Sequence, residues 1–146
     1  MPAFPTVLLL ALVGLAAACD ITSRRVPNVL VGAGIAAALI LHFADGGPLA
    51  PLRLGLAGAL AGGAIFLPLY LLRGMAAGDV KLMAMVGAFT GPVNVIPAAM
   101  LSCIAGGVLA LAMLFTARCI GRPAGGMPYA VAIAAGTACA LAATQA

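Results

Sequence analysis

Long apolar runs alternate along the whole chain with short breaks that contain charges, glycine and proline. A helix that crosses a bilayer needs about 20 mainly apolar residues. The uncharged stretch after Lys81 is too long for one such helix, and Gly91-Pro92-Val93-Asn94 supplies a turn near its middle. The pattern therefore predicts an all-α, polytopic membrane protein with six transmembrane helices, over residues 4–19, 29–43, 54–72, 80–90, 95–117 and 129–143.

The composition agrees with a membrane protein. Of the 146 residues, 65% are hydrophobic and 7% are charged, whereas soluble domains carry roughly 25% charged residues. The net charge of +4 comes from basic residues scattered between apolar runs, and the chain contains no Trp to stack on bases. We therefore expect a lipid bilayer, and no nucleic acid, as the surroundings of this protein.

The positions of the basic residues predict the orientation, because short loops rich in Lys and Arg stay on the cytoplasmic side. If both termini lie on the outer (periplasmic) side, the outer breaks contain Arg53 alone, and the inner breaks contain Arg24, Arg25, Arg73, Lys81, Arg118 and Arg122. A competing interpretation is that Ala16-Ala17-Ala18-Cys19 is a signal-peptide or lipoprotein cleavage site. Residues 1–5 carry no Lys or Arg, which favours an uncleaved first helix.

Several kinds of chemistry are excluded by the residues that the sequence lacks. It contains no Glu and a single His, His42, so a His-Glu-x-x-His zinc site cannot form and any hydrolytic triad would need His42. The four cysteines include no Cys-x-x-Cys pair and lie in or beside apolar runs, as small buried hydrophobic residues do. We expect no metal and no cofactor.

Three carboxylates remain. Asp45 begins an Asp-Gly-Gly-Pro sequence and is expected to be a turn residue. Asp20 and Asp79 are each expected at a junction of helix and loop on the same membrane face. Structural roles would explain both, since Asp79 could favour a helix start and Asp20 could pair with Arg24 four residues later.

The alternative is that Asp20 and Asp79 meet and act together. Two carboxylates about 3 Å apart share one proton, so that one can take a proton from water while the other donates to a peptide carbonyl. This is the one hydrolytic mechanism whose parts the sequence contains.

Three segments resemble the motifs of the type IV prepilin peptidase family: Asp20-Ile-Thr-Ser-Arg-Arg-Val-Pro27-Asn28, Gly74-Met-Ala-Ala-Gly78-Asp79-Val-Lys81, and Pro128-Tyr129 at the start of the last run. One position departs from the family pattern, because Ala76 replaces the first glycine of Gly-x-Gly-Asp. If that position required a positive φ, alanine would cost roughly 1 kcal/mol.

The resemblance implies an aspartic endopeptidase of the bacterial inner membrane that removes short basic leader peptides from type IV prepilins and pseudopilins at the cytoplasmic face. Asp20 and Asp79 match the catalytic aspartates, with Gly74, Gly78, Pro27 and Asn28 as supporting motif residues. Larger members carry an added segment with Cys-x-x-Cys pairs and also methylate the new N-terminus. We expect a single peptidase domain over residues 1–146 without that segment, most similar to the small peptidases of tight-adherence (Flp) pili.

The basic residues near the aspartates are candidate substrate contacts: Lys81, Arg24, Arg25 and Arg73. One or more of them could meet the acidic residue typical of a prepilin's mature N-terminus. Lys81 is two residues from Asp79, so on a helix the two side chains point apart. The alternative function is a non-enzymatic membrane protein, a channel or pilus-assembly subunit, in which the aspartates lie apart. The sequence leaves the oligomeric state and the individual prepilin open.

Overall fold

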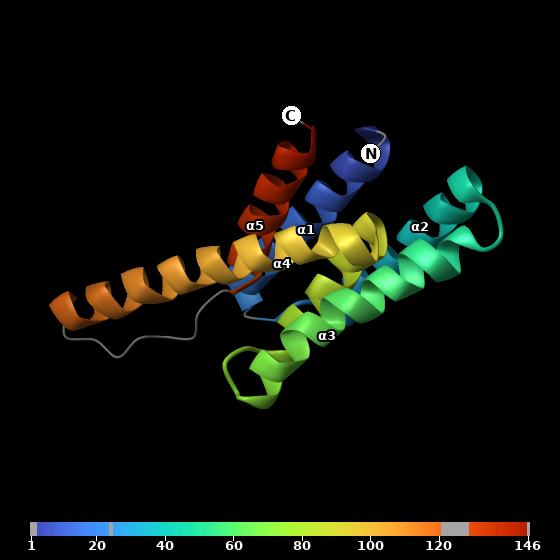
Figure 1. The fold of residues 1–146 in the computed structure, drawn as a ribbon. Coiled ribbons are helices and arrows are strands. Elements are labelled where there is room, and N and C mark those ends of the chain that lie inside the picture. Colours follow the sequence, from blue (N-terminus) through green and yellow to red (C-terminus); the bar gives the residue numbers. More distant parts are fainter. Residues whose placement is uncertain (1–2, 24, 121–128, 146) are drawn as a thin grey trace.

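The computed structural model describes residues 3–23, 25–120 and 129–145, and these residues are largely helical (Figure 1). The elements in chain order are α1 (Ala3–Ser23), α2 (Asn28–Gly46), a π-helical segment η1 (Pro51–Leu56), α3 (Ala57–Leu71), α4 (Ala77–Ile120) and α5 (Tyr129–Gln145). Within the described ranges, four helices are long and apolar enough to cross a membrane: α1, α2, η1 with α3, and α4. Helix α5 is apolar but shorter. The prediction of an all-helical membrane protein is confirmed.

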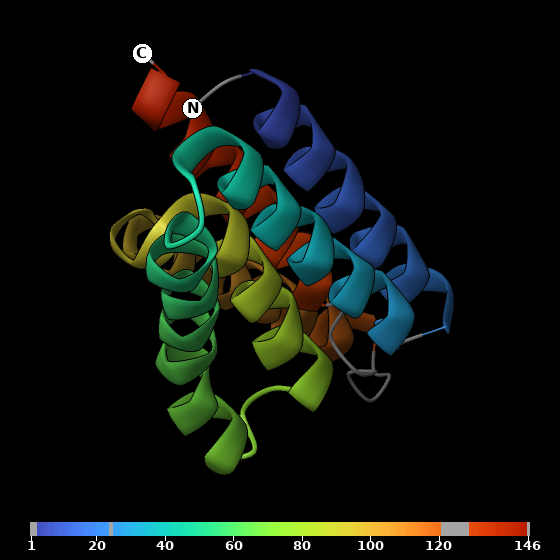
Figure 2. The same ribbon diagram turned by 90° about the vertical axis from the view of Figure 1, so that its right-hand side faces the viewer.

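The first and last helices lie side by side and run in opposite directions (Figures 1 and 2). The start of α1 and the end of α5 therefore lie at the same end of the molecule. Helix α3 packs along α4, and α2 packs against both η1 and α4. The opposite end gathers the end of α1 and the starts of α2, α4 and α5, and it contains both aspartate motifs.

Helix α4 bends sharply at Gly91, where the backbone leaves the helical conformation with φ 82° and ψ 170° (Figure 1). The predicted break in this stretch is confirmed, but it consists of one residue instead of a four-residue turn. Glycine adopts a positive φ without a Cβ clash, and Pro92 is suited to the first position of a new helix. The two segments thus cover residues 77–90 and 92–120, longer than the predicted 80–90 and 95–117. Counted as one helix, α4 leaves four candidate spans and the shorter α5 within the described ranges, and the six separate spans stay a prediction.

A histidine from another helix satisfies a carbonyl beside this break. Pro92 has no N–H, so the carbonyl of Ala88 lacks the donor that a regular helix supplies four residues later. The ring Nε2 of His42 in α2 lies 2.9 Å from this carbonyl oxygen and donates a hydrogen bond to it. Lipid offers no substitute donor. His42 is the single histidine of the sequence and hence the one candidate for a hydrolytic triad. In the structure its ring makes a structural contact with the backbone of α4.

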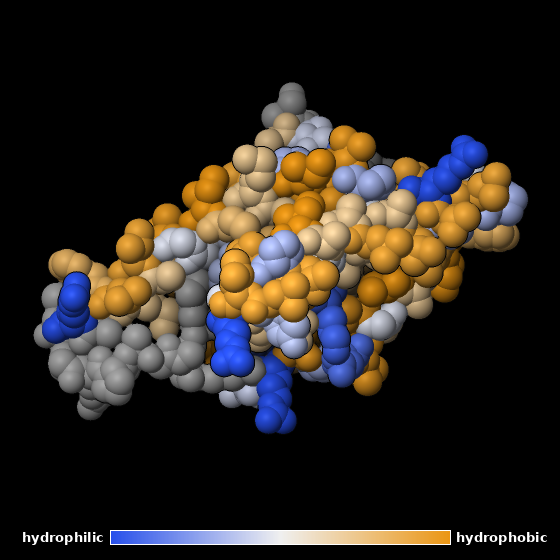
Figure 3. All heavy atoms as spheres, turned by 60° about the horizontal axis from the view of Figure 1, so that its bottom comes forward, coloured by the Kyte–Doolittle hydropathy of each residue, from blue (hydrophilic) through white to orange (hydrophobic). Residues whose placement is uncertain are grey.

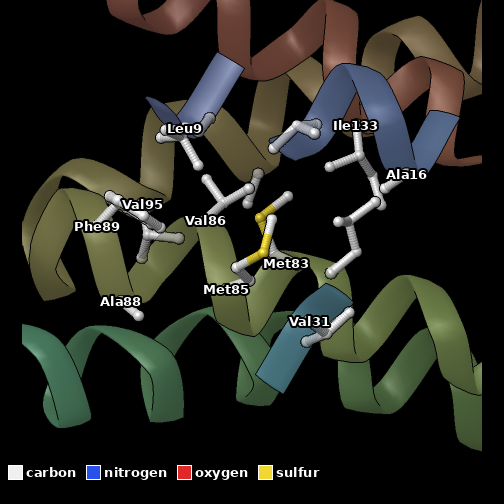
Figure 4. Packing of buried hydrophobic residues seen from close by; sticks show 14 of the residues in the cluster. Leu9, Ala16, Val31, Met83, Met85, Val86, Ala88, Phe89, Val95 and Ile133 are labelled. Atoms are coloured by element: carbon white, nitrogen blue, oxygen red, sulfur yellow. The ribbon is translucent and has the colours of Figure 1, made fainter. Parts of the chain in front are cut away.

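The core surrounds the first segment of α4 (Figure 4). Met83, Met85 and Val86 are fully buried there, together with Leu9 of α1 and Ile133 of α5. The face of the molecule seen in Figure 3 is mostly apolar, with few hydrophilic groups. Large hydrophobic side chains such as Leu111 and Phe115 are exposed, as expected for a surface that faces lipid.

Close approach of α3 to α4 depends on two glycines. A Cβ on Gly58 would collide with the backbone of Gly87, and a Cβ on Gly62 would collide with the backbone of Met83. Glycines four residues apart allow this spacing between membrane helices. The first segment of α4, which carries Asp79 at its start, is thereby fixed against α3.

Some predicted helix ends are wrong. Helix α1 continues past Asp20 to Ser23, and the hydroxyl of Ser23 donates to the Cys19 carbonyl at 2.7 Å. Asp45 is not in a turn, because α2 continues to Gly46 and the chain turns at Gly47, with φ 77°. The third span begins at Pro51, earlier than predicted. A charge ends an apolar run, but a helix ends only where its backbone hydrogen bonds end.

Candidate active site

The two aspartate motifs meet in a cavity of about 200 Å³. It lies where the end of α1 approaches the starts of α2 and α4. The structure brings Asp20 and Asp79 together in its lining, close enough for their charges to interact. Among the described residues, the lining consists of Asp20, Arg25, Val26, Asn28, Ala76, Gly78, Asp79 and Lys81.

Asp79 is the third residue of α4, and its side chain is only 4% exposed. Its Oδ2 accepts a hydrogen bond from the backbone N–H of Ala76 at 3.1 Å. The N–H of Asp79 in turn donates to the Ala76 carbonyl at 3.1 Å. A side chain three residues into a helix that bonds back to the capping residue is half of a capping box. The helix-start role expected for Asp79 and its place in the cavity are therefore compatible.

Asp20 lies in the last turn of α1 and is partly buried. Its Oδ2 accepts a hydrogen bond from the backbone N–H of Ala130, the second residue of α5, at 3.2 Å. The first N–H groups of a helix have no partner within it and favour a negative charge. Arg24, the other partner considered for Asp20, lies outside the described residues. Each aspartate is thus held by a backbone N–H at the start of a different helix.

The two motifs are also joined by side chains. The Nζ of Lys81 donates a hydrogen bond to Oδ1 of Asn28 at 3.0 Å. Asn28 is the first residue of α2, so this bond connects the starts of α2 and α4 at the cavity. Arg25 is exposed and also lines the cavity. Two of the candidate substrate contacts, Lys81 and Arg25, therefore lie in the same cavity as the aspartates.

Three other predicted site residues shape the backbone near the cavity and do not line it: Pro27, Arg73 and Gly74. Pro27 lies just before α2, and its carbonyl accepts a hydrogen bond from the N–H of Leu30 at 3.1 Å. Arg73 and Gly74 lie in the connection from α3 to α4. There the N–H of Gly74 donates to the Leu69 carbonyl at 2.8 Å, and Arg73 has a φ of 59°. This is the arrangement of a Schellman helix end, with arginine where glycine is usual.

The alanine that departs from the family pattern carries no backbone strain. Within the described ranges, Arg73 is the one residue other than glycine with a positive φ. Ala76 instead precedes α4 and supplies the N–H that binds Asp79. Gly78 also has no positive φ, and a Cβ there would make ordinary contacts of 3.5 Å with Val26. The anticipated cost of Ala76 therefore does not arise.

Sequence reasoning missed the N–H of Ala130, because a backbone donor has no signature in residue type. The only signal was its place directly after the Pro128-Tyr129 motif; Pro128 lies outside the described residues. Among the residues that the structure describes, no group of three or more His, Cys, Asp or Glu side chains could hold a metal ion.

Comparison with known proteins gives the family. No curated protein and no solved structure matches the chain significantly. The family model described as the type IV leader peptidase family matches residues 7–111. This range exceeds half of the chain and includes both Asp20 and Asp79, the two carboxylates of the cavity. The chain therefore belongs to the type IV leader peptidase family.

Proposed function

We propose that this protein is a membrane-embedded aspartic endopeptidase that removes the leader peptide from Flp-type prepilins and pseudopilins, with Asp20 and Asp79 as its catalytic residues. Membership in the family implies cleavage of prepilin leader peptides. The observation that carries the assignment to these residues is their shared position in one cavity, with interacting charges.

The chemistry follows from two carboxylates around one water molecule. One carboxylate, ionised, removes a proton from water as the water oxygen attacks the peptide carbonyl carbon. The other, protonated, donates its proton to the carbonyl oxygen, so that a tetrahedral intermediate forms without a covalent enzyme adduct. The first carboxyl group then gives its proton to the leaving nitrogen as the C–N bond breaks, and the other carboxylate takes back a proton from a hydroxyl group of the intermediate, which becomes the new carboxylic acid. One Oδ of each aspartate is held by a backbone N–H, and the second Oδ of each serves the reaction.

Six membrane crossings with the site at the cytoplasmic face of the bacterial inner membrane complete the proposal. In this arrangement the two segments of α4 cross separately and both termini are periplasmic. It is supported by the start of α1 and the end of α5, which lie at the end opposite the cavity (Figures 1 and 2). The basic residues Arg25 and Lys81 lie at the cavity itself, as the positive-inside rule requires.

The single domain would cleave prepilins without methylating them, because the sequence has none of the Cys-x-x-Cys pairs of the larger members.

Lys81 and Arg25 are the proposed contacts for the acidic residue of the mature prepilin N-terminus. If Lys81 has this role, Lys81→Glu and reversal of the substrate acid to Lys should each reduce cleavage, and together they should restore it.

Replacement of single aspartates by asparagine tests the function. The amide oxygen of Asn can still accept the hydrogen bonds from Ala130 and Ala76, so Asp20→Asn and Asp79→Asn should insert and fold. Each should lose cleavage of a co-expressed prepilin, measured as the loss of the mobility shift on a gel. Asp45→Asn is the matched control, since this exposed aspartate lies outside the cavity lining. Normal cleavage by either of the first two variants would refute the catalytic pair.

A further inference from the structure

We propose that the first turn of α5 is a positioning element of the active site, in which the backbone N–H of Ala130 holds Asp20 in its reactive orientation. This inference rests on the proposed function of Asp20. The Ala130 nitrogen lies 3.2 Å from Asp20 Oδ2, and Ala130 is 0% exposed. The hydrogen bond therefore has little competition from water at its donor end.

The start of α5 is held in place by contacts that do not involve Asp20. The ring of Tyr129 packs edge-on against the ring of Phe66 in α3, with centroids 6.1 Å apart and an interplanar angle of 75°. The same ring fills the space over Gly106 of α4, where a Cβ would come within 2.5 Å of it. Because contacts with α3 and α4 fix the first turn of α5, the direction of the Ala130 N–H does not depend on the Asp20 carboxylate.

A second close approach fixes the direction of α5 about two helical turns further along. A Cβ on Gly136 would collide with the backbone of Ser102 in α4, so α5 lies as near to α4 at this point as two backbones allow. Because α5 is held at Tyr129 and again at Gly136, the N–H groups of its first turn keep their direction when the side chain of Asp20 rotates.

The two aspartates are thus oriented by donors from different helices. Asp79 bonds to the N–H of Ala76 just ahead of its own helix, whereas Asp20, at the end of α1, depends on α5. The start of α5 also approaches the second aspartate, because Tyr129 interacts electrostatically with Asp79 and with Cys103. The start of α5 therefore lies near both carboxylates, and its one hydrogen bond to them in the described residues is the backbone bond from Ala130 to Asp20.

The test removes one hydrogen and leaves the side chains intact. An ester is placed before position 130 by incorporating the α-hydroxy analogue of alanine, which replaces the N–H by oxygen. We expect kcat for prepilin cleavage to fall about tenfold or more, as for a lost hydrogen bond to a charged group, while KM changes less than about twofold. The control is the ester at Val131, the next residue in the same turn, which should retain kcat.

A more accessible pair of variants makes the same comparison. Ala130→Pro removes the N–H in a helical turn where proline is tolerated, and Ala130→Gly keeps it. The proline variant should reproduce the loss of kcat, and this loss should exceed that of the glycine variant by about tenfold.

An unchanged kcat for the ester at 130, or equal losses for the esters at 130 and 131, would overturn the inference. An active Asp20→Asn variant would instead refute the catalytic role of Asp20 itself. If Asp20→Asn is inactive while the ester at 130 is fully active, then Asp20 is needed for cleavage but α5 does not position it.

Discussion

The ammonium nitrogen of Lys81 donates a hydrogen bond to the side-chain oxygen of Asn28, 3.0 Å away. The two residues are 53 positions apart in the sequence and lie near the starts of different helices. Their contact holds the start of α2 beside the start of α4, and so keeps the two aspartate motifs at a common cavity. Lys81 is exposed, so the bond lies at the edge of the site, where a substrate could compete for it.

Lys81→Met and Asn28→Ala should therefore have non-additive effects on cleavage. Each single variant should lower kcat/KM several-fold. The kcat/KM of the double variant should be no lower than that of the less active single variant. A coupling of about 0.5–1 kcal/mol is expected for residues in direct contact. Additive losses would contradict the pairing. A normal Asn28→Ala variant beside a defective Lys81→Met variant would indicate that Lys81 acts on the substrate alone.

His42→Phe should destabilise the protein without removing its activity at low temperature. Phenylalanine keeps a ring in α2 but has no donor for the Ala88 carbonyl, which is left without the hydrogen bond at 2.9 Å. An unsatisfied buried carbonyl costs about 1–3 kcal/mol. The measurement is unfolding in detergent micelles, with Asp45→Ala as a control in the same helix. A His42→Phe variant as stable as the parent would show that this bond contributes nothing.

Arg73→Gly should stabilise the end of α3. The residue has a φ of 59°, which costs a side chain with a Cβ about 1 kcal/mol or more relative to glycine. Arg73→Ala is the matched control, because it removes the charge but keeps the Cβ and hence the strain. Equal unfolding free energies for the Gly and Ala variants would argue against backbone strain at this position.

Neighbouring glycines of α3 should respond differently to the same substitution. The Cβ of Gly62→Ala would collide with the Met83 backbone, whereas that of Gly63→Ala would meet only the Ala84 side chain at 3.7 Å. We expect Gly62→Ala to lose about 1–3 kcal/mol of unfolding free energy through overpacking. Gly63→Ala should be neutral or gain up to about 1 kcal/mol from helix propensity. Similar effects at the two positions would mean that α3 can move away from α4.

The apolar pattern was enough to predict the helical class and the break at Gly91, because both depend on residue type. It was less reliable for helix ends. Asp45 lies inside α2 because the chain turns at Gly47, which has a positive φ, whereas Gly46 is still helical. The sequence Gly46-Gly47 does not indicate which of the two glycines makes the turn. Likewise α1 passes Asp20 because its backbone hydrogen bonds continue to Ser23.

The candidate site was predictable where it consists of unusual side chains. Asp20 and Asp79 stand out in a chain with three carboxylates, and the structure brings them to one cavity. The partners that orient them could not be predicted, since Ala76 and Ala130 act through backbone N–H groups that every residue except proline possesses. Gly74 was assigned to the site from its motif and Arg73 from its charge near the aspartates, but both shape the connection between α3 and α4.

The hydrogen bond between Asp20 and Ala130 spans 110 positions of the chain, and this span bears on biosynthesis. Both aspartates leave the ribosome before the donor that orients the first of them, because this donor belongs to α5. A nascent chain therefore contains both carboxylates well before it can hold them as a pair. Peptidase activity should begin only once α5 has inserted beside α1, so a partly inserted chain would not cleave prepilins.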